Sequence, residues 1–160
     1  MLSVCSSHGL KILSFGTLAA GFLSNIWLGA EEPDSVTLNR GKYIHYALIS
    51  HIGGWAYFQH LLQILDKIAM KHQVDIAAVA SRFILQQKAV SSVVIGARLG
   101  ITKYIDSNLR ILSFSLDHDD FNEINSFISK GRKLEVTLAE IGSEYRKAKI
   151  TPIAPLKISN

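Results

Sequence analysis

Two short apolar segments, residues 10–15 and 91–95, limit what this chain can fold into more than any other feature. Each is short and apolar, and glycine lies next to it, which is typical of strands buried in a parallel sheet. A long, largely helical stretch separates them. Because parallel strands need a helical crossover, this order predicts an α/β fold with a parallel sheet and helical cover. Two such strands alone are poorly protected, so the sequence implies strand partners that it does not contain.

Helices are predicted between and after these strands. Residues 43–52 are expected to form a short helix that ends at Gly53, and apolar positions recur at helical spacing from Trp55 onward. Asp75 is expected to cap a further helix, and Asp117 with Asp120 is expected to begin the last clear one. The helix after the second strand is expected to bury three side chains, Ile105, Leu109 and Leu112.

The length and the charge of the chain limit its domain size and the partners that it can bind. A chain of 160 residues suits one domain but falls short of a complete (β/α)8 barrel, which needs roughly 200 residues. The net charge of +4 arises entirely within residues 130–160, where seven basic and three acidic residues are interleaved. This dispersed pattern favours a solvated surface over nucleic-acid binding. No apolar run approaches the ~20 residues of a membrane span, so no membrane partner is expected.

The single cysteine, Cys5, excludes an internal disulfide framework and fits a reducing compartment, so we expect a cytoplasmic protein. The apolar run of residues 12–23 follows Lys11 and precedes a small-residue stretch that ends at Ala30, which imitates a secretory leader. The competing interpretation is a buried strand followed by a turn, and it is favoured because Gly16 and Gly21 interrupt the run. A small secreted protein cleaved near Ala30 remains the alternative.

Residues 93–109 contain the strongest candidate for a binding site. They form an apolar strand, a glycine-bounded turn that carries Arg98, and an immediate helix start. Unpaired backbone N–H groups at a helix start favour an anion, and a guanidinium suits phosphate. Spacing alone also permits ordinary strand–helix punctuation. The six histidines show no metal-ligand spacing, and Asp117, Asp119 and Asp120 suit a helix start better than acid–base catalysis.

Motifs spread over nearly the whole chain resemble those of a known family. They are residues 13–24 (LSFGTLAAGFLS), 53–55 (GGW), 58–59 (FQ), 93–109 and 142–146 (GSEYR). Together they are similar to aldo-keto reductases, in particular to a bacterial and chloroplast subgroup. The resemblance implies that the chain is the C-terminal part of a (β/α)8 TIM barrel: strands seven and eight with their helices, in a helix-rich, incomplete barrel. It also implies a partial domain over residues 1–150 and an irregular tail over residues 151–160.

The resemblance further implies an NADP(H) site. Phe15 matches an aromatic residue, usually Tyr, that stacks on the nicotinamide. Gly16, Thr17 and Leu18 lie where backbone amides meet the pyrophosphate, although many members have Pro at the position of Thr17. The remaining implied cofactor residues lie on the adenosine side: Gly96, Arg98, Lys103, Tyr104 and Asn108. Arg98 and Asn108 match 2′-phosphate and adenine contacts, and either Lys103 or Tyr104 occupies the position of a further phosphate contact.

The implied activity is the NADP(H)-dependent reduction of an aldehyde or ketone, in the cytoplasm or, for a longer parent, an organelle stroma. The family's catalytic Tyr, Lys, Asp and His match nothing in residues 1–160, so no catalytic residue is assigned and the chain alone is expected to be inactive. The alternative is a non-enzymatic or vestigial half-barrel that pairs with a partner, either a second copy or a missing N-terminal half.

Overall fold

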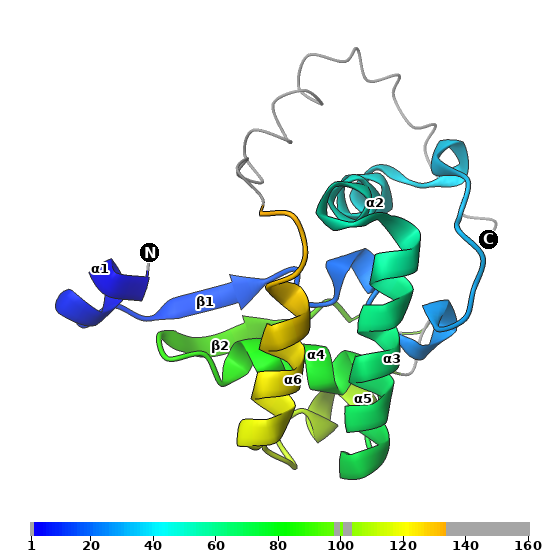
Figure 1. Cartoon of the computed structure of the whole chain (residues 1–160). Helices are drawn as coiled ribbons and strands as arrows, with labels where there is room; N and C mark the ends of the chain where they lie inside the picture. Colours follow the sequence, from blue (N-terminus) through cyan, green and yellow to red (C-terminus); the bar gives the residue numbers. More distant parts are fainter. Residues whose placement is uncertain (1, 98–99, 101–103, 134–160) are drawn as a thin grey trace.

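The computed structural model describes residues 2–97, 100 and 104–133 of the chain, which form a helix-rich α/β unit (Figure 1). The helices and strands are α1 (Leu2–Ser7), β1 (Ile12–Phe15), α2 (Arg40–Ile52), α3 (Gly54–His72), α4 (Ile76–Leu85), β2 (Val90–Val94), α5 (Ile105–Arg110) and α6 (His118–Ile128). Three single-turn 3-10 helices lie between β1 and α2: Ala19–Gly21, Asn25–Trp27 and Ser35–Thr37.

The two strands pair in parallel, as the sequence predicts. Ile12 is the register partner of Val90 and Phe15 that of Val94, with one irregularity in register after Ile12. Helices α2, α3 and α4 form the crossover between the strands. Because the strands run in the same direction, both carboxyl ends lie at one edge of the sheet.

The core lies where α3, α4 and α6 meet, and Figure 1 shows these three helices grouped beside the sheet. Phe22, from the segment after β1, is fully buried among them. The apolar faces predicted for α3 and α4 are confirmed, since Phe58, Leu62 and Ile76 are almost completely buried. Residues 12–15 form a strand, and cleavage near Ala30 would remove both β1 and Phe22 from this unit.

The predicted caps of α4 and α6 are also confirmed, whereas α2 begins at Arg40 and not at the predicted residue 43. Asp75 accepts a hydrogen bond from the Ala78 N–H at 2.8 Å, and Asn25 accepts one from the Ile76 N–H at 3.1 Å. Asp117 and Asp120 form a capping box at the start of α6. These side chains satisfy backbone donors that a helix start leaves unpaired.

A buried carboxylate joins α3 to α6. Asp120 is almost fully buried, and its two oxygens accept hydrogen bonds from Lys71 Nζ at 2.8 Å and from His72 Nε2 at 2.7 Å. Burial alone would raise the pKa of Asp120, but the hydrogen bonds from Lys71 and His72 outweigh it and hold the pKa below its usual value. Lys71 also pairs with Asp117 at 2.6 Å, and this contact lowers the pKa of Asp117 to about 2.

One expectation about burial is wrong, and one is confirmed. Helix α5 leaves Ile105, Leu109 and Leu112 exposed and does not bury them as a stripe, whereas Ile111, just after the helix, is buried. The sheet is covered on one face only among the described residues. Ser14 and Val93 are partly covered, but Leu13, Phe15 and Val94 lie on the opposite face and are 51–80% exposed. Parallel sheets are normally covered on both faces, and the sequence analysis expected these two strands alone to be poorly protected, which the described residues confirm.

Within the described part of the chain, no helix combines the length and apolar character needed to cross a bilayer. The predicted tail, residues 151–160, lies outside the described residues.

We predict that acid weakens the contact between α3 and α6. Because the folded-state pKa values of Asp117 and Asp120 lie below the usual 3.8, their contribution to stability is complete above that pH. It is lost as the pH falls through the folded-state values, about 2 for Asp117. Asp120→Asn should cost about 2 kcal/mol of unfolding free energy near neutral pH and should flatten this acid dependence, measured by urea unfolding across pH.

The control is Asp119→Asn, which removes a carboxylate from the same helical turn but leaves the contacts of Lys71 and His72 intact. The same acid dependence in both variants would contradict the assigned role of Asp120.

Candidate functional site

The parallel pairing places two loops at one edge of the sheet. Phe15 and Val94 are register partners at the carboxyl ends of β1 and β2, so the loop that begins at Gly16 and the turn that contains Gly96 leave the same edge. Phe15, Gly16, Thr17 and Leu18 were assigned to the nicotinamide and pyrophosphate, and Gly96 to the adenosine side. The structure brings these five residues to one edge of the sheet.

The loop after β1 has an unusual backbone. Gly16 and Gly21 adopt positive φ angles of 73° and 90°, and Ala19 and Ala20 adopt 48° and 54°. A left-handed conformation is costly for alanine, so surrounding contacts must hold it. They include hydrogen bonds from the Ala19 N–H to the Gly16 carbonyl at 3.0 Å and from the Gly21 N–H to the Leu18 carbonyl at 2.8 Å.

Several backbone donors of this loop, two of them at the successive residues Thr17 and Leu18, have no partner in the described part of the chain. The N–H groups of Ala19 and Gly21 are used within the loop, but those of Thr17 and Leu18 meet no acceptor among the described residues. Thr17 is buried and Leu18 is half-buried. Successive unpaired N–H groups at a strand end are suited to an anionic ligand.

The side chain of Thr17 is occupied by a different contact. Its hydroxyl lies 3.3 Å from the Ser81 hydroxyl of α4, and both residues are buried. The Thr17 hydroxyl is thus directed to α4, while its backbone N–H remains available to a ligand among the described residues. Sequence analysis did not single out Ser81, and the available signal was a polar residue between the apolar positions Ala80 and Phe83 of α4.

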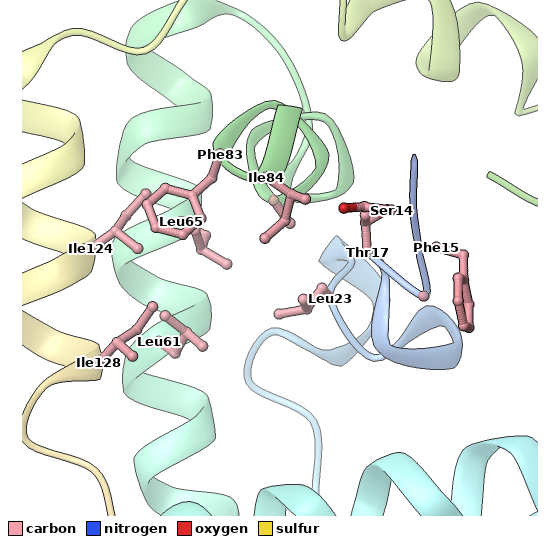
Figure 2. Close-up of a pocket in the computed structure, with 12 residues that line it drawn as sticks. Ser14, Phe15, Thr17, Leu23, Leu61, Leu65, Phe83, Ile84, Ile124 and Ile128 are labelled. Atoms are coloured by element: carbon pink, nitrogen blue, oxygen red, sulfur yellow. The ribbon is translucent and has the colours of Figure 1, made fainter. Parts of the chain in front are cut away.

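Phe15 is exposed at the strand end. Figure 2 shows its ring on the far side of the strand end from the labelled side chains of α3, α4 and α6, and 80% of the residue is accessible to solvent. A ring in this position is available for stacking on a planar ligand.

An apolar cavity of about 370 Å³ lies on the helix side of this strand end (Figure 2). Its main apolar walls come from α3, α4 and α6: Leu61, Leu65, Phe83, Ile84, Ile124 and Ile128. None of its described lining residues is charged, so it suits an apolar group and not a phosphate.

The adenosine-side residues are only partly described. Tyr104 is exposed directly before α5, and Asn108 is half-buried within α5. Arg98 and Lys103, the two cations assigned from the sequence, lie outside the described residues. In the described ranges, no group of three or more His, Cys, Asp or Glu residues could hold a metal ion.

Comparison with known proteins agrees with the family resemblance found in the sequence. The model of the aldo/keto reductase family matches residues 1–129. The chain is 35% identical over 89 residues to flagellar radial spoke protein 5 of Chlamydomonas reinhardtii, which covers 52% of the chain and 16% of that protein. It is 25% identical over 124 residues to an aryl-alcohol dehydrogenase of Pestalotiopsis microspora, with 78% and 28% covered. The matched part of the chain is thus less than a third of either relative's length.

The two buried hydroxyls generate a stability prediction. Ser81→Ala should lower the free energy of unfolding by about 1–2 kcal/mol, because the buried Thr17 hydroxyl loses its partner. The double variant Ser81→Ala with Thr17→Val should cost less than the sum of the single changes, since it leaves no unpaired hydroxyl. Urea unfolding of the four proteins measures this coupling, and strictly additive effects would show that the two hydroxyls do not interact.

Proposed function

Because this chain belongs to the aldo/keto reductase family, we propose that it is the C-terminal part of an NADP(H)-dependent oxidoreductase that reduces aldehydes or ketones. In this proposal β1 and β2 are the seventh and eighth strands of a (β/α)8 barrel, within a partial domain of residues 1–150. The relative with an aryl-alcohol dehydrogenase name supports the reaction class. The loops after β1 and β2 support their assignment as the seventh and eighth strands, because phosphate sites in such barrels often use the loops after those two strands.

The observation that carries the proposal is the loop after β1. It combines the exposed ring of Phe15 with N–H groups of Thr17 and Leu18 that meet no acceptor in the described part of the chain. In the proposed site the ring stacks on the nicotinamide, and the backbone of Gly16, Thr17 and Leu18 binds the pyrophosphate. These groups fit a dinucleotide, since one end offers a π-face and the other offers hydrogen-bond donors to an anion.

The second loop completes the proposed binding side. Gly96 lies in the turn that leaves β2, Arg98 binds the 2′-phosphate, and Asn108 contacts the adenine. Lys103 or Tyr104 adds a further phosphate contact. A guanidinium is favoured for the 2′-phosphate because it presents donors in a planar fork.

NADPH, when bound, supplies the hydride for the carbonyl carbon. The groups assigned here to this chain bind and orient the cofactor. None of them is assigned to donate the proton that the carbonyl oxygen needs, so the chain by itself is expected to turn over no carbonyl substrate.

The test of the cofactor site is nucleotide binding by the 160-residue chain, measured by NADPH fluorescence. Binding should be weak, because only part of the cradle is present, and Arg98→Ala should abolish it by removing the charge-assisted bonds to the 2′-phosphate. The matched control is Lys88→Ala, which removes one positive charge before β2, at the opposite edge of the sheet. Equal affinity of the wild type and Arg98→Ala would contradict the phosphate assignment.

A second candidate function is non-enzymatic pairing with a partner. The exposed face that carries Leu13, Phe15 and Val94 favours it, because an uncovered apolar sheet face promotes association. The relative whose name places it in the flagellar radial spoke supports an assembly role. The partner in this proposal is a second copy or a separate N-terminal half-barrel.

We predict that the isolated chain forms oligomers at micromolar concentration, measured by light scattering, and melts with poor cooperativity. Replacing Leu13 and Val94 with Thr should shift the population toward monomer, because it reduces the apolar area of the open sheet face. The control is Met70→Thr, which removes an equally exposed apolar side chain from α3. A wild-type chain that is monodisperse, monomeric and sharply melting would contradict the proposed pairing.

A further inference from the structure

Helix α5 is held in place in an unusual way. It has only six residues, Ile105–Arg110, and none of them is buried. Its large apolar side chains Ile105 and Leu109 are directed to solvent. Helices this short are marginal without tertiary contacts, so the placement of α5 must depend on other interactions.

Two polar contacts to α4 anchor α5, one within the helix and one just after it. The Ser107 hydroxyl donates a hydrogen bond to one carboxylate oxygen of Asp75. Arg82 donates a hydrogen bond to the Ile111 carbonyl at 3.3 Å. Arg82 also donates to the Ser115 hydroxyl at 2.7 Å, so the chain beyond α5 is fixed to α4 as well.

Asp75 serves both helices at once. One of its oxygens accepts the Ala78 N–H and begins α4, while the other accepts the Ser107 hydroxyl of α5. The start of α4 is also capped by Asn25. The position of α5 therefore depends on the well-anchored start of α4. The bond that joins them links a hydroxyl to a charged carboxylate, and such a bond is stronger than one between neutral groups.

Asn108 directly follows Ser107 and is half-buried. Its side-chain amide has no hydrogen-bond partner among the described residues, so this group is available to a ligand. We propose that Asp75 is a positioning residue, which, through the Ser107 hydroxyl, sets the place of Asn108 for the adenosine part of the cofactor. This inference rests on the proposed function and extends it to a residue that touches no cofactor.

The test compares two fragments of the cofactor. Adenosine 2′,5′-bisphosphate probes the adenosine side, and reduced nicotinamide mononucleotide probes the side near Phe15. Ser107→Ala should weaken binding of the bisphosphate by about tenfold, because loss of the bond to Asp75 releases α5. It should leave binding of the mononucleotide unchanged, which a general loss of folding would not. Ser107→Thr keeps a hydroxyl and should restore binding of the bisphosphate.

The matched control is Ser113→Ala. Ser113 lies just beyond α5, and its hydroxyl bonds only to the local Arg110 carbonyl among the described residues, at 2.8 Å. Its replacement should change neither affinity.

Hydrogen exchange provides a readout that needs no ligand. In Ser107→Ala the backbone N–H of Asn108, which bonds to the Tyr104 carbonyl at 2.9 Å, should exchange faster, while the N–H groups of α4 keep their protection. Unchanged exchange at Asn108, or equal bisphosphate affinity in the wild type and Ser107→Ala, would overturn the role of Asp75 and leave the proposed function standing. A wild-type chain that binds neither fragment would overturn both.

Discussion

The parallel pairing of β1 with β2 is the constraint on which the rest of this structure depends. Strands that run in the same direction cannot be joined by a tight turn, so the chain between them must cross over through helices. Here that crossover supplies α3 and α4, whose apolar faces form the core with α6 and with Phe22. The same pairing places the carboxyl ends of both strands at one edge, where the two candidate binding loops begin.

The open face of this sheet leaves apolar side chains exposed, whereas the other face packs toward the helices. The helices partly cover Ser14 and Val93, whereas Leu13, Phe15 and Val94 remain in contact with solvent. This apolar face, which no described residue covers, explains why the chain has both a ring available for a planar ligand and a surface that favours association. The two proposed functions therefore arise from the same physical feature, and the exposed Phe15 belongs to both.

Polar contacts set the geometry where apolar packing does not. The Thr17 and Ser81 hydroxyls connect the loop after β1 to α4, and Asp75 connects α4 to α5 through Ser107. Asp120 likewise connects α6 to α3 through Lys71 and His72. Each contact joins groups that are partly or fully removed from water, so the loss of one partner leaves the other unsatisfied. For this reason a single substitution at one of these positions is expected to destabilise the contact between the two elements that it joins.

Features that depend on near neighbours in the chain can be predicted from local sequence. The caps at Asp75 and Asp117, the apolar face of α3 and the parallel relation of the two strands all follow from local spacing and from the order of elements. Family membership likewise followed from motifs along the chain. Burial could not be determined in this way. The periodicity of Ile105, Leu109 and Leu112 identifies an apolar stripe, but only the arrangement of the other elements decides whether anything covers it. Likewise, the contact between Thr17 and Ser81 joins residues 64 positions apart, and local patterns carry no information about such partners.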